Sequence, residues 1–173
     1  RELGAAVKLL RAELFLGGFN DGELSDDRSA RRRLVEVFRR FQPTLVLAHS
    51  AEDYHSDHRA ASHLAEVASW AAAARGLRTA SPPLAAAPAL WWMDTIEMHQ
   101  FAPGFYVDVS EFVGLKERML RCHRSQLSRG RDGNFSPLLD LMRLQCQSRG
   151  IQSGVAAAEA FRIHPAFKRA RAW

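Results

Sequence analysis

Hydrophobic and polar positions follow two periods along the chain, one typical of amphipathic helices and one typical of short buried strands. Helical spacing of apolar residues is found in residues 1–11, 26–41, 56–75, 110–120, 137–148 and 153–161. Short apolar runs predict strands at residues 13–16, 44–48, 89–93 and 105–109. The run at 44–48 is continuously apolar, which predicts a strand covered on both faces.

The start and the polar face of the second helix are also predicted. Ser25 offers an N-cap, and Asp26 and Asp27 fall in the first turn, where the helix dipole favours negative charge. The helix is expected to end before Pro43. Its arginines are expected to form a solvated face, and they are Arg31, Arg32, Arg33, Arg39 and Arg40.

The alternation of strands and helices predicts an α/β fold. We expect a Rossmann-like, mostly parallel sheet with helices on both faces, formed by residues 1–173 as a single domain. With 47% hydrophobic residues, the chain can bury a core. Ligands of such sheets bind beyond the carboxyl ends of the strands, which points to the loops at residues 17–22 and 49–59.

Composition narrows the classes of function. The net charge of +5 suggests a nucleic-acid partner, but no recognised nucleic-acid-binding module accompanies it, so none is expected. No apolar run reaches the roughly 20 residues that span a membrane, so a membrane partner is not expected either. Cys122 and Cys146 lie apart in predicted helices and are interpreted as reduced thiols.

The segment His55-Ser56-Asp57-His58 carries the clearest chemistry. Two histidines three positions apart at the mouth of a helix can direct both imidazoles towards one point, and neutral imidazole is a good zinc ligand. Asp57 can orient one of the rings, and Glu52 and Asp53 add negative charge nearby. Spacing alone leaves two interpretations open, a metal site or a polar helix start with surface histidines.

The segment TLVLAHSAEDYHSDHRAAS resembles the second signature of the LmbE/PIG-L de-N-acetylases, in which an apolar strand and a loop precede His-x-Asp-His at the start of a helix. Further segments resemble the family in order and spacing, namely RELGAAVKLLRAE, FNDGEL, MDTIEMHQFAPGFYVDVS, FYVDVSEFVGLKERMLRCHRSQL and RGIQSGVAAAEAFR. The resemblance covers nearly the whole chain and is closest to the deacetylases of bacillithiol biosynthesis.

The resemblance implies roles for individual residues. His58 falls on a zinc ligand of the family, and His55 falls on the histidine that stabilises the oxyanion or protonates the leaving amine. Asp57 falls on the carboxylate of the motif, which supports these groups. Asp21 borders the mouth of the site, in a structural or a substrate-binding role, and His99 lies in a loop that faces substrate. The roles of two further residues stay open, His123 and Glu159.

The resemblance also implies a function. Family members begin with a strand ending in Ala-His-Pro-Asp-Asp-Glu, and no such motif occurs in these 173 residues, so the domain is expected to be N-terminally truncated. The expected function is that of a cytoplasmic, Zn²⁺-dependent hydrolase that removes the acetyl group from an N-acetylglucosamine-containing small molecule, such as an N-acetylglucosaminyl-malate-like substrate, and forms a trimer or hexamer. The alternative is a catalytically incomplete fragment or paralogue that acts as a non-enzymatic binding or structural module.

Overall fold

A computed structural model describes residues 1–129 and 137–165. The described residues form two compact units. Unit 1 contains Arg1–Leu16, Ile96–Met98 and Tyr106–Ala160, and unit 2 contains Gly17–Thr95, His99–Phe105 and the described residues from Phe161 onward. That the two units make up a single domain stays a prediction.

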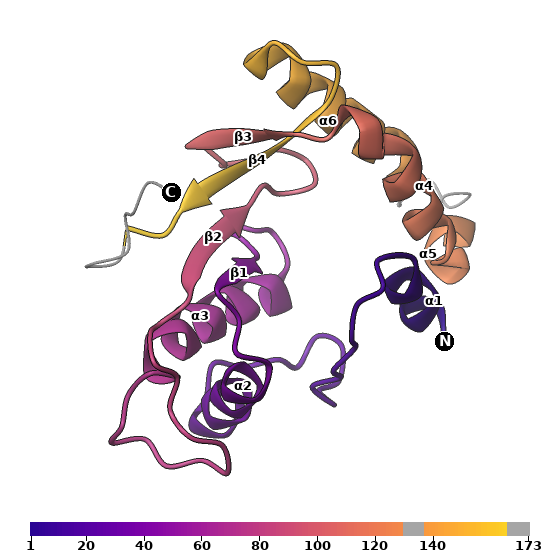
Figure 1. Cartoon of the computed structure of the whole chain (residues 1–173). Coiled ribbons are helices and arrows are strands. Elements are labelled where there is room, and N and C mark those ends of the chain that lie inside the picture. The colour runs from indigo at the N-terminus through magenta and orange to yellow at the C-terminus, as the bar shows by residue number, and fades with distance from the viewer. Residues whose placement is uncertain (130–136, 166–173) are drawn as a thin grey trace. The chain divides into compact units, whose positions relative to one another are not determined.

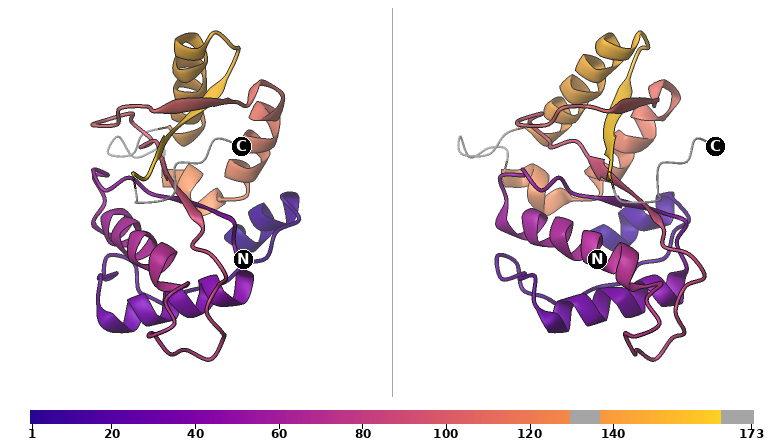
Figure 2. Two further views of the ribbon diagram at one scale, coloured as in Figure 1. Left: turned by 60° about the vertical axis from the view of Figure 1, so that its left-hand side comes forward. Right: turned by 90° about the vertical axis from the view of Figure 1, so that its left-hand side faces the viewer.

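Unit 2 is built from two parallel strands covered by two helices. β1 (Leu45–Ala48) pairs with β2 (Ala89–Met93) in parallel register. α3 (Ser56–Ala71) packs along both strands and lies between them and α2 (Arg28–Phe41) (Figures 1 and 2). In the apolar core of this unit, small alanines at the end of α3 pack against larger side chains of α2. Its buried members are Val35, Phe38, Ala68, Ala71 and Ala72.

Unit 1 is mainly helical. α4 (Val113–Arg121) packs against both α1 (Glu2–Leu9) and α6 (Leu138–Ser153), as Figure 1 shows. A 3-10 turn, η1 (Ser110–Phe112), leads into α4, and α5 (Arg124–Arg129) follows it. The buried core of this unit consists of Val109, Met142, Cys146 and Ala157.

The sheet has four strands in the order β1-β2-β4-β3. β4 (Ala158–Ile163) runs antiparallel to β2, with Trp91 opposite Ile163. It also runs antiparallel to β3 (Phe105–Asp108), because Gly104 N donates to Phe161 O and Val109 N donates to Ala157 O. The predicted α/β class is confirmed, but the sheet is mostly antiparallel rather than mostly parallel. The alternation of strands and helices along the chain does not determine which neighbouring strands run parallel and which run antiparallel.

Two predicted elements were wrong. Residues 153–161 were expected to be helical, but α6 ends at Ser153, Gly154 follows with φ +76°, and the chain then enters β4. Residues 13–16 were expected to form a strand, but they have no regular structure and no strand partner in the described ranges. Leu14, Phe15 and Leu16 are exposed there.

Two details of the second helix also differ from expectation. Asp27, not Ser25, is the N-cap, since its Oδ1 accepts the backbone N–H groups of Ser29 and Ala30. Ser25 Oγ donates to Asp27 Oδ2 instead.

β1 is also less covered than predicted, because Leu47 is 49% exposed.

Arg39 corrects the prediction of a solvated arginine face. It is only 2% exposed, whereas Arg40 beside it is exposed. Its guanidinium donates to the carbonyl oxygens of Ala72 (3.0 Å) and Ala74 (2.8 Å), which lie just past the end of α3 and also accept the backbone N–H groups of Leu84 and Leu77. It also donates to Thr79 Oγ1 at 2.9 Å. One buried side chain therefore joins α2 to the end of α3 and to the segment that follows.

We expect Arg39→Leu to lower the free energy of unfolding by roughly 2–4 kcal/mol, because several buried and partly buried oxygen atoms lose a charged donor at once. Urea unfolding followed by circular dichroism measures this effect. Arg40→Leu is the matched control, since it removes an exposed arginine from the next position of the same helix. Equal stability of the two variants would contradict the assigned role of Arg39.

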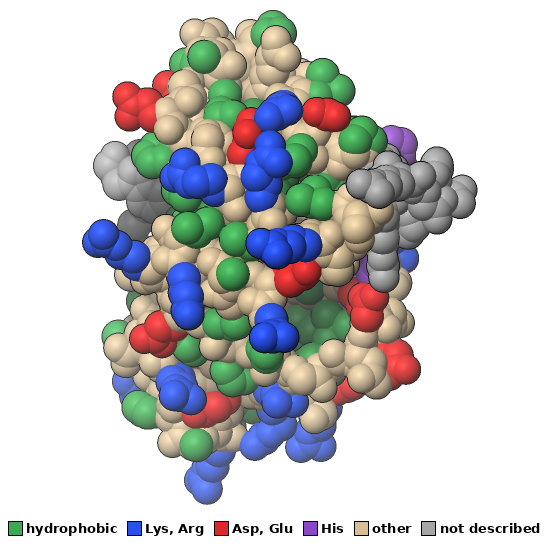
Figure 3. Space-filling view, turned by 90° about the vertical axis from the view of Figure 1, so that its right-hand side faces the viewer, with side chains coloured by type: hydrophobic (Ala, Val, Ile, Leu, Met, Phe, Trp, Pro, Cys, Tyr) green, Lys and Arg blue, Asp and Glu red, His purple; other side chains and the backbone are tan. Residues whose placement is uncertain are grey.

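The charge distribution on one face, the hydrophobicity of the helices and the state of the two cysteines can be read from the structure. On the face drawn in Figure 3, Lys and Arg side chains are interspersed with acidic and hydrophobic ones. Within residues 1–129 and 137–165, none of the helices combines the length and hydrophobicity that a bilayer crossing requires. Cys122 and Cys146 are both free thiols, as interpreted from the sequence.

Candidate metal centre

The His-x-Asp-His segment lies where the carboxyl end of β1 meets the start of α3. β1 ends at Ala48, and α3 begins at Ser56, with His55 as its N-cap. The connecting loop holds itself in place, since Asp53 N donates to Ser50 O, and Arg59 Nη1 donates to the carbonyl oxygens of Asp53 and Tyr54. A parallel strand thus delivers the loop to the edge of the sheet where ligands of α/β folds bind.

Three side chains of this region form a cluster of metal-ligand type. His49, Asp53 and His58 each offer one donor atom, and these atoms lie within 4.8 Å of one another. The rings of His49 and His58 are stacked, with centroids 4.0 Å apart and an interplanar angle of 8°. Asp53 Oδ1 lies 3.0 Å from His58 Nδ1. The loop therefore brings two imidazoles and one carboxylate together.

His55 borders this cluster but is held differently. Its ring centroid is 4.8 Å from that of His58. Its Nδ1 accepts the backbone N–H of Asp57 at 3.2 Å, which makes the imidazole the side-chain cap of α3. Its own backbone N–H donates to Asp53 Oδ1 at 3.0 Å. The two histidines of the motif are thus neighbours, as their spacing predicted.

Asp57 ties a second loop to the start of α3. Its Oδ2 accepts the backbone N–H of Gly22 at 2.7 Å. Gly22 has φ +83°, a conformation that favours glycine, and it follows Asp21 directly. Asp57 Oδ1 is buried and has no hydrogen-bond donor among the described residues, so it is available to a bound group. The carboxylate that contacts a ring is Asp53, while a catalytic role for Asp57 stays a prediction.

The two residues predicted to bind substrate are both exposed. Asp21 lies in the turn that Asp57 anchors, which keeps it beside the start of α3. His99 follows β2 in a separate loop, where its carbonyl oxygen accepts from Thr95 Oγ1 at 3.0 Å. Among the described contacts, none joins the His99 ring to the histidine cluster. Substrate-binding roles for both residues stay predictions.

The electrostatics of the cluster favour metal binding by His49. Burial, the largest effect, lowers the pKa of the His49 imidazole, and the neighbouring His58 and His55 lower it further, while Asp53 opposes them. The ring is therefore neutral at neutral pH. A neutral imidazole keeps a lone pair, which is the state that binds a metal ion.

Two members of the cluster were not assigned a role from the sequence. His49 directly follows β1, and this position at the carboxyl end of a parallel strand is the signal that could have identified it. Asp53 was noted only as negative charge near the motif. Its contact with His58 spans five residues through a folded loop, so spacing rules for regular helices do not reveal it.

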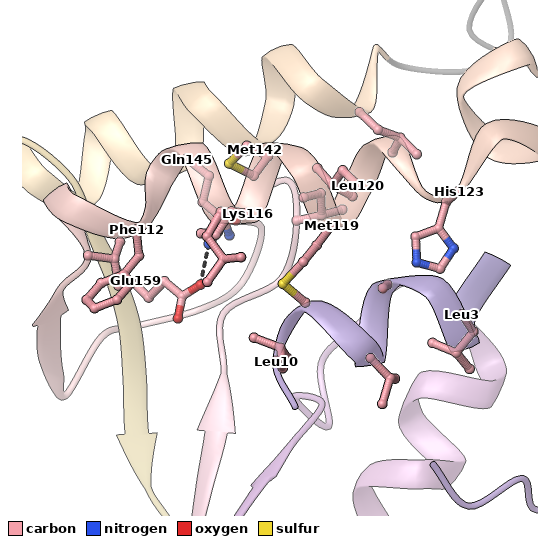
Figure 4. A pocket seen from close by; sticks show the side chains of 16 residues that line it. Leu3, Leu10, Phe112, Lys116, Met119, Leu120, His123, Met142, Gln145 and Glu159 are labelled. Carbon is pink, nitrogen blue, oxygen red and sulfur yellow. Dashed lines mark hydrogen bonds and ion pairs between the residues drawn. The ribbon is translucent and has the colours of Figure 1, made fainter. Parts of the chain in front are cut away.

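A separate cavity lies in unit 1 and contains none of the cluster residues. It measures about 600 Å³ and is lined largely by apolar side chains of α1, α4 and α6 (Figure 4). Lys116 forms an ion pair with Glu159 on its wall. His123 also lines it. Lys116 is therefore the described ion-pair partner of Glu159, whose role the sequence left open.

Comparison with known proteins relates the first part of the chain to one family. Residues 1–69 match the family model described as PIG-L: GlcNAc-PI de-N-acetylase, and these residues include the whole histidine cluster. The 4-oxalmesaconate hydratase of Pseudomonas putida is 30% identical over 131 residues, which are 72% of this chain and 49% of that protein. The chain thus spans about half the length of this curated relative.

Solved structures share the fold. A conserved protein from Thermus thermophilus has a TM-score of 0.81 at 29% identity, over 99% of this chain and 76% of that one. The 4-carboxy-2-hydroxymuconate hydratase of Pseudomonas putida has a TM-score of 0.79 at 26% identity, over 99% and 73%. The N,N'-diacetylchitobiose deacetylase of Pyrococcus horikoshii has a TM-score of 0.78 at 23% identity, over 95% and 62%, and this likeness concerns the fold alone.

The relatives that are named by activity are enzymes, a deacetylase and hydratases. The family model and the structural neighbours together support a PIG-L/LmbE-type deacetylase fold for this chain.

Proposed function

We propose that the protein is a zinc-dependent hydrolase that removes the acetyl group from a small molecule containing N-acetylglucosamine. The observation that carries the proposal is the cluster of His49, Asp53 and His58 within 4.8 Å, next to the ring of His55. It supplies metal donors and an additional imidazole at one edge of the sheet. The match of residues 1–69 to a de-N-acetylase model supports the same reaction class.

The donor set fits zinc. Imidazole nitrogen and carboxylate oxygen are both zinc ligands, and ligands at about 2.0–2.1 Å in a tetrahedron lie about 3.4 Å apart. The donor atoms here spread over as much as 4.8 Å, so binding would require a small inward shift. His58 would bind through Nε2, since Nδ1 is engaged by Asp53, and His49 would provide a second imidazole. When bound, zinc supplies Lewis acidity that activates water and polarises a carbonyl group.

Residues of the chain would stabilise charge, donate a proton and position the substrate. His55 would stabilise the oxygen of the acetamide as negative charge develops on it, or donate a proton to the leaving amine. Its place as the N-cap of α3 fixes the ring before substrate arrives. Asp57, through Gly22, would hold the 17–22 loop at the mouth of the site. Asp21 and His99 are proposed to contact the sugar.

A second candidate reaction is the hydration of an unsaturated carboxylate. The observation that favours it is the 30% identity to 4-oxalmesaconate hydratase over 131 residues. Both reactions add the elements of water to a substrate, so the same histidine cluster suits either. The bond that is attacked differs, an amide in the first and a carbon–carbon double bond in the second.

The two reactions are separated by their products. We expect the full-length gene product, loaded with zinc, to release acetate from N-acetylglucosaminyl-malate or a related N-acetylated sugar, and to leave 4-oxalmesaconate unchanged. Loss of absorbance of the unsaturated acid without acetate release would favour the hydratase. If neither substrate reacts and no zinc binds, the non-enzymatic module is favoured. The expected trimer or hexamer stays a prediction, which light scattering of the same sample checks.

A further inference from the structure

Asp53 is the one buried carboxylate within residues 1–129 and 137–165. Its side chain is 6% exposed, compared with 37% for His58. One oxygen, Oδ1, makes two hydrogen bonds of 3.0 Å, one with the backbone N–H of His55 and one with His58 Nδ1. Its own backbone N–H and carbonyl group are bonded to Ser50 and Arg59. A group bonded on so many sides is fixed in position before any ligand arrives.

These bonds determine where the proton of each imidazole lies. A carboxylate oxygen that accepts a backbone N–H is an acceptor, so His58 Nδ1 beside it must carry the hydrogen. The lone pair of the neutral ring is then on Nε2. His55 is in the opposite situation, because its Nδ1 accepts the N–H of Asp57 and must be unprotonated. The hydrogen of the neutral His55 ring is therefore on Nε2.

We propose that Asp53 is a positioning residue that holds His58 in the Nδ1–H tautomer, while the start of α3 holds His55 in the Nε2–H tautomer. The two neighbouring rings thereby present opposite groups, a lone pair on His58 and an N–H donor on His55. The first suits a metal ligand and the second suits a donor to an oxyanion. The assignment of tautomers stands on hydrogen bonds alone, and only the use made of them rests on the proposed function.

The same geometry argues against Asp53 as a direct metal ligand through Oδ1. To bind an ion with this oxygen, Asp53 would have to weaken its bonds to His55 N and His58 Nδ1, and the partly buried backbone N–H of His55 would lose its acceptor. Carboxylates that bind the second nitrogen of a ligating histidine fix its orientation and raise its basicity. Asp53 is placed for that role.

Nitrogen-15 NMR of the histidine side chains tests the proposal on the metal-free, full 173-residue chain. In the wild type, we expect His58 to show a protonated Nδ1 and His55 a protonated Nε2. Asp53→Leu removes the acceptor and should convert His58 to the Nε2–H form or to a mixture. Asp53→Asn keeps an acceptor oxygen and should preserve the Nδ1–H form. A protonated Nε2 on wild-type His58, or an unchanged spectrum in Asp53→Leu, would overturn the proposal.

Zinc titration of the same variants gives the second readout. Asp53→Leu is expected to weaken zinc binding by roughly 10–100-fold, and Asp53→Asn by less, since the ring keeps its orientation. Glu52→Gln is the matched control, because Glu52 is the adjacent carboxylate and bonds Ser50 and Arg162 rather than a histidine. Equal loss in Asp53→Asn and Asp53→Leu would refute positioning through the hydrogen bond. Since the NMR result needs neither zinc nor substrate, failure of the deacetylase assay leaves it intact and the two outcomes stay distinguishable.

Discussion

Replacing His58 with alanine is expected to weaken zinc binding by more than about 100-fold, because losing a ligand costs more than the roughly 10–100-fold typical of a supporting residue. His58 combines a ring nitrogen fixed by Asp53 with 37% side-chain exposure, so its free nitrogen is oriented and accessible. Competition titration with a zinc chelator on the full-length product measures the change.

His63→Ala is the matched control for this variant. His63 lies on the same helix, α3, is exposed, and is not a member of the histidine cluster. Its replacement should leave the zinc affinity unchanged. Wild-type zinc affinity in His58→Ala would remove the ligand assignment, whatever the control shows.

The second large effect is expected at His55. His55→Ala should retain zinc, since His55 is outside the donor cluster, and should lower kcat for acetate release by about 10²–10⁴-fold, as loss of an acid–base or oxyanion group does. Steady-state kinetics together with zinc analysis of the same preparation measures both quantities.

The capping role of His55 must be separated from its chemical role. Its Nδ1 accepts the N–H of Asp57, so alanine also removes a helix cap, at a cost of about 1 kcal/mol in the free energy of unfolding. His55→Asn is the control, because asparagine is a strong N-cap residue but no acid–base group. We expect His55→Asn to restore stability and not turnover. Full turnover in His55→Asn would show that only the cap matters.

Much of the fold follows from local pattern. β2 was predicted at residues 89–93 and is observed at Ala89–Met93. A five-residue apolar run between a proline-containing and a polar segment is too short for a buried helix and is typical of a strand. The helices at α2 and α3 were also predicted, since each repeats apolar residues over three or more turns. These elements need only their own sequence and one buried face.

What was missed depends on partners far along the chain. β4 was predicted to be helical, and its strand conformation arises from pairing with β2, about 70 residues earlier. Residues 13–16 have strand-like sequence but no strand neighbour in the described ranges. Arg39 was placed with its solvated neighbours, although the end of α3 surrounds it with carbonyl groups. The spacing of residues within α2 does not reveal that carbonyl groups of another segment surround this guanidinium.

The site likewise combines residues that local spacing identifies with residues that only the folded loop brings together. His55 and His58 were identified from their spacing at a helix start, where three-residue separation brings two rings to one side. His49 and Asp53 join them only because the loop after β1 folds back onto the start of α3. The motif therefore predicted where the cluster lies but supplies only His58 of its three members, and the folded loop adds His49 and Asp53.

The most direct test of the central claim is acetate release from an N-acetylglucosamine-containing substrate by the full-length product, measured before and after zinc is removed by chelation. We expect activity to disappear with the metal and to return when about one zinc per chain is restored. Acetate release that persists in zinc-free protein, or a protein that binds zinc at neither histidine of the cluster, would contradict the account.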